Sequence, residues 1–241
     1  MPERLGHPVV GVIGGMGPQA TVDLMQRVVS RTPAEDDVDH IHMIVDNNPK
    51  VPSRIAALIE ETGPSPLPEL VRMAKGLEAS GATLLAMPCN TAHGYASEIA
   101  ASVGIPLLDM VALTVAQVAA RPLPHRRIGL LASTAVLKLG LYEKAFAAQG
   151  IDTLIPARQD DLMAVIRAVK RGETGPTTRD RFAAIGQELF AAGADVLVIA
   201  CTELSLFVDV FGEDTPALDA MDVLAEEIIR AAGIAPLGRV A

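Results

Sequence analysis

The two cysteines, Cys89 and Cys201, are the residues whose type and placement indicate chemistry in this chain of 241 residues. Each follows a short apolar run that is typical of a buried strand, and each precedes a segment in which we expect a helix. A thiol at a helix N-terminus lies near the positive end of the helix dipole, which lowers its pKa below about 8.5. Both thiols are therefore candidates for proton transfer.

An internal repeat places the two cysteines at equivalent positions. The segment 81–91 (GATLLAMPCNT) is similar to the segment 193–203 (GADVLVIACTE), so that Cys89 corresponds to Cys201. If the two copies face each other across a cleft, a thiolate on one side can remove a proton from a carbon while a thiol on the other side donates one to the opposite face. Such a pair must be held in opposite protonation states, and its action inverts a stereocentre.

Short apolar runs alternate with helical patterns along the chain. The runs contain Val, Ile and Leu without polar alternation, which is typical of parallel strands covered on both faces. We expect strands at 8–14, 40–46, 83–87, 105–108, 127–132, 152–155, 195–200 and 217–218. We expect helices at 18–31, 52–61, 68–80, 110–121, 135–149, 160–171, 177–192 and 221–232. This alternation predicts an α/β fold with open, doubly wound parallel sheets.

The repeat divides this pattern into two similar halves, each with a four-stranded parallel sheet flanked by helices. We expect a first α/β domain at 1–108 and a second at 109–218, with the C-terminal helix within 219–241 packing back on the first. Ligands of open α/β sheets bind at the carboxyl ends of the strands, where both cysteines fall. The sequence therefore predicts an active site in the cleft between the two domains.

The composition argues against several classes of partner. The net charge is −9, from 29 acidic and 20 basic residues, whereas a surface that binds nucleic acid is basic. No apolar stretch reaches the roughly 18 residues of a membrane span, and the first residues lack the apolar core of a signal peptide. We expect a cytoplasmic protein that binds a small molecule, and neither nucleic acid nor a membrane.

Three motifs resemble those of the aspartate/glutamate racemase family, most of all its aspartate racemase branch: 14–21 (GGMGPQAT), 88–93 (PCNTAH) and 201–204 (CTEL). The resemblance covers nearly the whole chain. It implies two Rossmann-like domains, a homodimer, and a racemase that needs no cofactor and acts on a small acidic amino acid. It also implies that Cys201 deprotonates the L-enantiomer and Cys89 the D-enantiomer.

Hydroxyl and amide side chains near the cysteines could hold the α-carboxylate and the amine of such a substrate. A carbanion needs donors that strengthen as charge develops, and backbone N–H groups at helix N-termini are of that kind. Residues at such positions also cap helices. The candidates are Asn90, Thr91, Ser133, Thr134 and Thr202, with Met16 as an apolar wall of the pocket. The family that the chain resembles also has Ser-Thr at 133–134.

Cations are required as well, because a net charge of −9 repels a dianionic substrate. Arg54 and Lys170 match a family arginine and lysine, and a guanidinium binds a carboxylate through two parallel hydrogen bonds. Glu203 is expected to orient the surroundings of Cys201. The family often has Pro-Asp-Arg-Thr where this chain has PSRI at 52–55, which leaves the side-chain specificity open between aspartate and glutamate.

Three other chemistries are disfavoured. The segment 15–20 fits a dinucleotide-binding fingerprint, but Pro18 lacks an N–H for a pyrophosphate, and Asp46 is 29 residues beyond Gly17 instead of about 20. The His and Cys residues have no zinc-site spacing, so we expect no metal. Redox cysteines normally lie close together in one motif, unlike these two.

Related enzymes and a non-catalytic protein remain as alternatives. The enzymes are a glutamate or hydantoin racemase, a maleate isomerase and an arylmalonate decarboxylase, the last disfavoured because its pattern keeps one cysteine. Maleate isomerase would not exchange an amino acid's α-proton with solvent. A protein that only binds an acidic metabolite would have no use for paired cysteines.

Overall fold

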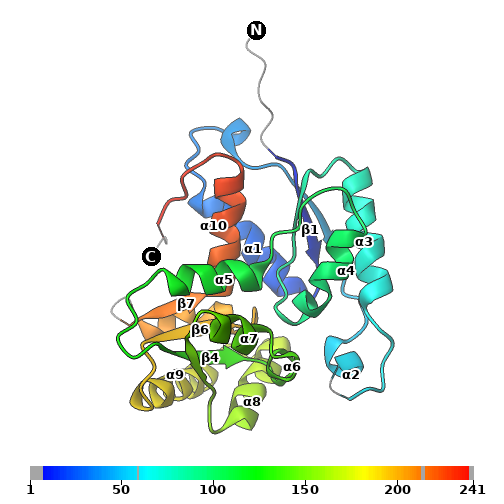
Figure 1. Ribbon diagram of the computed structural model, residues 1–241. Helices are drawn as coiled ribbons and strands as arrows, with labels where there is room; N and C mark the ends of the chain where they lie inside the picture. The colour runs from blue at the N-terminus through cyan, green and yellow to red at the C-terminus, as the bar shows by residue number, and fades with distance from the viewer. Residues whose placement is uncertain (1–7, 59, 213–214, 239–241) are drawn as a thin grey trace.

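The computed structural model describes residues 8–58, 60–212 and 215–238, and within them two parallel sheets (Figure 1). The first has the order β2-β1-β3 and the second the order β5-β4-β6-β7, with all neighbours parallel. The strands are β1 (Val10–Gly14), β2 (Met43–Asn47), β3 (Leu84–Ala86), β4 (Arg127–Ala132), β5 (Asp152–Leu154), β6 (Val196–Ala200) and β7 (Ala217–Asp219). The predicted α/β class with two parallel sheets is confirmed.

Helices cover both faces of each sheet. The α-helices are α1 (Pro18–Arg31), α2 (Arg54–Leu58), α3 (Leu67–Ala79), α4 (Ala96–Ala101), α5 (Met110–Ala119), α6 (Thr134–Leu139), α7 (Leu141–Ala148), α8 (Gln159–Lys170), α9 (Pro176–Ala191) and α10 (Ala220–Ala231). Short 3-10 helices are η1 (Asp37–Asp39), η2 (Thr91–Tyr95) and η3 (Leu204–Phe211). No helix among the described residues is long and apolar enough to cross a membrane.

The strand residues alternate between two core clusters in each half. Val10 and Val12 of β1 pack against α1 and α10, whereas Ile13 packs against α3 on the opposite face. In the second sheet, Ile128 of β4 packs against α5 and α7, whereas Leu131 packs against α8 and α9. Each sheet is therefore buried on both faces, which explains the continuous apolar strands.

The first sheet has three strands instead of the expected four. The segment 105–108 forms only an isolated bridge, Leu85 to Leu107, whereas its equivalent in the second half is β7. The neighbouring strand is also shorter, because Pro88 occupies the position that Ala200 has in β6. Proline has no N–H for the ladder, so β3 ends before this position.

Two predicted helices differ from the expectation. The helix expected at 135–149 is divided into α6 and α7 at Gly140, which has a φ of 62°. Of the helix expected at 52–61, the described residues form α2 at Arg54–Leu58, and residue 59 lies outside them. The segments that follow the cysteines are the 3-10 helices η2 and η3, so neither thiol is followed directly by an α-helix N-terminus.

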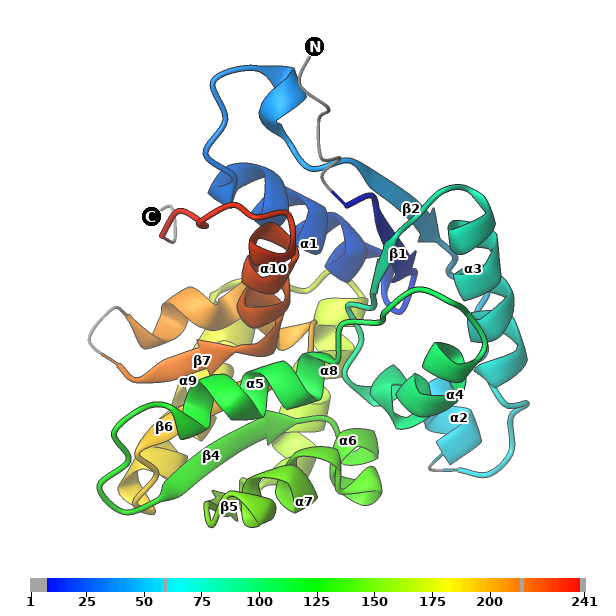
Figure 2. The same ribbon diagram turned by 45° about the horizontal axis from the view of Figure 1, so that its top comes forward.

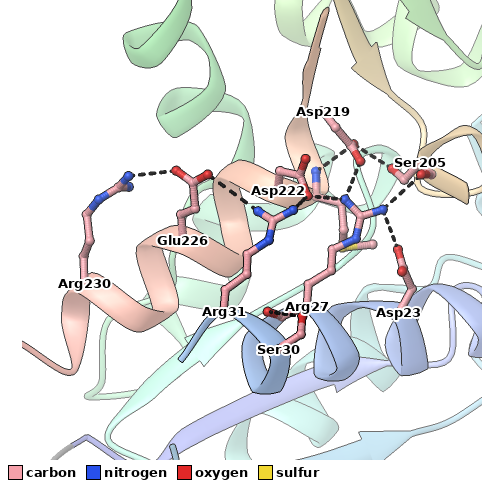
Figure 3. Close-up of polar contacts among 10 residues, drawn as sticks. Asp23, Arg27, Ser30, Arg31, Ser205, Asp219, Asp222, Glu226 and Arg230 are labelled. Carbon is pink, nitrogen blue, oxygen red and sulfur yellow. Dashed lines mark hydrogen bonds and ion pairs between the residues drawn. The ribbon is translucent and has the colours of Figure 1, made fainter. Parts of the chain in front are cut away.

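A buried ionic cluster joins α1 to α10 (Figure 3). Arg27 of α1 binds Asp219 at 2.6 Å and Asp23 at 2.9 Å, and it also pairs with Asp222. Arg27 further donates to the main-chain oxygen of Ser205 at 3.0 Å, so that one guanidinium contacts α10, η3 and its own helix. Figure 2 shows α10 beside α1, next to the first sheet. This packing supports the proposed division near residue 108, which stays a prediction.

Candidate active site

Both cysteines line one cavity of about 60 Å³ at the carboxyl ends of the strands. Cys89 lies three residues beyond the end of β3, and Cys201 lies directly after β6, so the two thiols reach the cavity from the two different sheets. The cavity is lined by Met16, Ser53, Arg54, Ile55, Cys89, Asn90, Thr91, Ser133, Met163, Ile166, Lys170, Ala200, Cys201, Thr202 and Glu203. The fold therefore brings the repeat's two cysteines to one place.

One predicted site residue, Thr134, is not among those that line the cavity. Its N–H points to the sulfur of Met163 at 3.3 Å, and its hydroxyl accepts from Gln159 at 3.4 Å. Both partners belong to α8, so Thr134 ties the start of α6 to that helix. The prediction that it contacts the substrate is not supported by this placement.

Several lining residues were not predicted: Ser53, Ile55, Met163, Ile166 and Ala200. Met163 and Ile166 precede Lys170 by seven and four residues on α8. Residues at this spacing lie on the same face of a helix. Met163 and Ile166 could therefore have been predicted to line the cavity from the position of Lys170. Ser53 and Ile55 flank Arg54 at the start of α2.

Cys201 is held as a thiol by its neighbours. Cys201 is only 6% exposed, and its thiol donates to the carboxylate of Glu203, with 3.2 Å between Sγ and Oε2. The other carboxylate oxygen lies 3.3 Å from Nζ of Lys170. Burial first, and the negative charge of Glu203 second, raise the pKa of Cys201 well above its usual value, and Lys170 opposes this in part. The expectation of a lowered pKa is therefore wrong for Cys201.

The surroundings of Cys89 differ from those of Cys201. The repeat places Thr91 where the second half has Glu203, so no carboxylate follows Cys89 at that position. The main-chain oxygen of Cys89 accepts from Nδ1 of His93 at 2.9 Å, and Nε2 of His93 accepts from the N–H of Met110 at 3.1 Å. Both ring nitrogens are thus used by the main chain, and burial lowers the pKa of His93, which keeps the ring neutral.

Asn90 lines the cavity and has an unpaired donor. Its Oδ1 accepts from the hydroxyl of Tyr142 at 2.5 Å, which fixes the orientation of the amide. Its Nδ2 is buried without a hydrogen-bond partner among the described residues. A buried donor of this kind is costly unless a ligand or water accepts from it. Thr91 and Ser133 lie beside it, with 3.4 Å between their hydroxyls. This cluster is suited to a carboxylate.

Two cationic side chains, Arg54 and Lys170, also line the cavity. Arg54 donates through Nη1 to the main-chain oxygens of Val51 at 3.4 Å and Pro52 at 3.1 Å. A guanidinium carries five N–H donors, so this leaves donors for a ligand. Lys170 is 45% exposed and pairs with Glu203. No group of three or more His, Cys, Asp or Glu residues in the described part of the chain could hold a metal ion.

Comparisons with known proteins agree with the motifs. The model of the Asp/Glu/hydantoin racemase family matches residues 13–228. The broad specificity amino-acid racemase RacX of Bacillus subtilis is 25% identical over 226 residues, covering 92% of this chain and 96% of RacX. Among solved structures, the aspartate racemase of Picrophilus torridus is 31% identical with a TM-score of 0.85, covering 95% of this chain and 96% of that one.

A further solved structure shares the fold. An aspartate racemase homologue from Pyrococcus horikoshii is 18% identical with a TM-score of 0.73, and the match covers 94% of this chain and 99% of that chain. The family match, which spans most of the chain, settles the classification. The chain belongs to the Asp/Glu/hydantoin racemase family and is an amino-acid racemase, as the motifs around Cys89 and Cys201 predict.

Proposed function

We propose that the protein interconverts L- and D-aspartate, with glutamate as the second candidate substrate, by proton transfer between Cys89 and Cys201. The observation that carries this proposal is that the two cysteines, from equivalent positions of a repeat, line one cavity from two sheets. A substrate between them would have one thiol on each face of its α-carbon. The reaction needs no other acid or base.

The hydrogen bond from Cys201 to Glu203 supports an order for the two roles. Because burial and Glu203 raise the pKa of Cys201, this residue is the acid of the resting enzyme, and Cys89 is the base. The Cys89 thiolate takes the α-proton, and the electron pair stays on the α-carbon. The Cys201 thiol then protonates the opposite face and becomes a thiolate. The reverse reaction, or proton exchange with solvent, restores the resting state.

The remaining polar groups would bind the substrate and stabilise the carbanion. The unpartnered amide N–H of Asn90, with the hydroxyls of Thr91 and Ser133, would donate to the α-carboxylate as charge spreads into it. Arg54 and Lys170 would hold the side-chain carboxylate. The relative named aspartate racemase supports this choice of substrate. We also propose, from the family resemblance, that the protein is a cytoplasmic homodimer.

Proton NMR in D₂O tests the proposal directly. L- and D-aspartate and L- and D-glutamate are incubated separately with the protein and no added cofactor, and the α-proton signal is followed together with optical rotation. We expect the α-proton signal of aspartate to disappear while both enantiomers form. If none of the four compounds exchanges its α-proton, the assignment is wrong, and a maleate isomerase or a binding protein becomes the better hypothesis.

A further inference from the structure

A second cavity, of about 210 Å³, adjoins the one that contains the cysteines. By the same measure the cysteine cavity has about 60 Å³, so the second is more than three times as large. The two cavities share Arg54, Lys170, Thr202 and Glu203. The start of α1, the end of α8 and η3 supply the rest of its wall: Gly17, Pro18, Gln19, Ala20, Val169 and Leu206.

The shared residues lie where the substrate's side chain would end. In the proposed function, the α-carbon lies between the cysteines, and the α-carboxylate lies at Asn90, which lines only the first cavity. Arg54 and Lys170, the proposed partners of the side-chain carboxylate, line both cavities. An aspartate would therefore end at the border and leave the second cavity unfilled.

The second cavity suits an uncharged chain of carbon atoms. Ala20, Val169 and Leu206 present aliphatic groups to it, and the first two are almost fully buried. The charged groups at its border already have partners, since Lys170 pairs with Glu203 at 3.3 Å and Arg54 donates to main-chain oxygens. A neutral side chain can pass the Lys170–Glu203 pair without separating it.

We propose that the second cavity is a side-chain subsite through which this enzyme also racemises amino acids with long, unbranched, uncharged side chains, such as methionine and norleucine. This inference rests on the proposed two-cysteine racemisation, because the position of the α-carbon defines which part of the substrate reaches the subsite. Each methylene group that enters an apolar pocket improves kcat/KM by roughly tenfold or more. Short side chains, such as that of alanine, gain nothing from the subsite.

The test measures α-proton exchange in D₂O for aspartate, alanine, methionine and norleucine. Leu206→Phe fills the subsite, and Leu206→Ala enlarges it at the same position. Val22→Phe adds the same ring on α1 at a side chain that is 50% exposed, away from both cavities, and is the matched control. Thermal unfolding of each variant checks that it is folded. The ratio of kcat/KM for methionine to that for aspartate is the readout, because it does not depend on the active fraction.

We expect wild type to exchange methionine and norleucine faster than alanine. Leu206→Phe should lower the methionine-to-aspartate ratio at least tenfold, whereas Leu206→Ala and Val22→Phe should not lower it. Exchange of aspartate alone, or an unchanged ratio in Leu206→Phe, overturns the inference and leaves the proposed function intact. If neither an acidic nor an uncharged amino acid exchanges, the proposed function itself fails, and the subsite with it.

Discussion

The hydroxyl of Tyr142 donates to Oδ1 of Asn90 at 2.5 Å, which links α7 of the second half to the turn after Cys89 in the first half. Tyr142 is fully buried, and burial raises its pKa, so the hydroxyl keeps its proton and remains a donor at any ordinary pH. The oxygen of the Asn90 amide is therefore occupied, and its N–H groups are the ones left for a ligand. Tyr142, which does not line the cavity, thus sets the polarity of the proposed carboxylate site.

Tyr142→Phe should weaken substrate binding. Without the hydroxyl, the amide of Asn90 is free to turn its oxygen toward the carboxylate, so we expect KM for aspartate to rise roughly fivefold, equivalent to about 1 kcal/mol. The effect should disappear in an Asn90→Ala background, where no amide remains to be oriented. Steady-state kinetics of the two single variants and the double variant check this. An equal rise of KM in both backgrounds would show that Tyr142 acts only through packing.

Single replacements of the cysteines should separate exchange from inversion. In Cys201→Ser, the Cys89 thiolate can still remove the α-proton of one enantiomer and return a deuteron to the same face. We therefore expect a loss of racemisation of at least about a thousandfold, while D-aspartate still exchanges its α-proton in D₂O. Cys89→Ser should show the opposite preference, for L-aspartate. Exchange of both enantiomers by either variant would contradict a two-sided mechanism.

The sequence predicted the meeting of the two cysteines but not the state of each thiol. The repeat places Cys89 and Cys201 at equivalent positions after a strand. Because the equivalent ends of the two sheets face one cleft, the meeting of the two cysteines could be predicted. The raised pKa of Cys201 depends on burial and on the rotamer of Glu203, neither of which a sequence motif contains. The role of Tyr142 depends on a contact between residues 52 positions apart.

The helices and strands could also be predicted where their formation depends on the local sequence. Apolar runs without alternation predicted the parallel strands, and the repeat predicted their grouping into two sheets. The early end of β3 follows from Pro88, a difference between the two copies that was visible in the sequence. The division of α6 from α7 at Gly140 was less visible, because a glycine within a helical pattern does not by itself end a helix.

Glu203→Gln should shift the pH dependence of one direction of the reaction. Glu203 raises the pKa of Cys201, so the neutral amide should lower that pKa. In the direction that uses Cys201 as the acid, activity falls when this thiol loses its proton. The descending limb of kcat/KM for D-aspartate should therefore move to lower pH. Lys170→Met is the opposing control, because Lys170 lowers the pKa of Cys201 and its removal should move the limb to higher pH.

The measurement is the pH profile of kcat/KM for each enantiomer with wild type and both variants. L-aspartate requires the Cys201 thiolate, so its ascending limb should move in the same direction as the descending limb for D-aspartate. Both variants also alter substrate binding, which changes the height of the pH profile. The position of each limb of kcat/KM reports a pKa of the free enzyme, so weaker binding does not move it. Shifts in the same direction for Glu203→Gln and Lys170→Met would refute the assigned acid.

Arg27→Met should destabilise the protein strongly. Arg27 compensates the buried carboxylate of Asp219, and it shares Asp222 with Arg31. Its removal leaves Asp219 without its cation, which typically costs about 3–5 kcal/mol. Arg230→Met is the matched control, because that guanidinium is 47% exposed and pairs with Glu226 on the surface of α10. Such a pair contributes less than about 1 kcal/mol. Urea unfolding of both variants measures the difference, and equal losses would show that the cluster contributes no more than a surface ion pair.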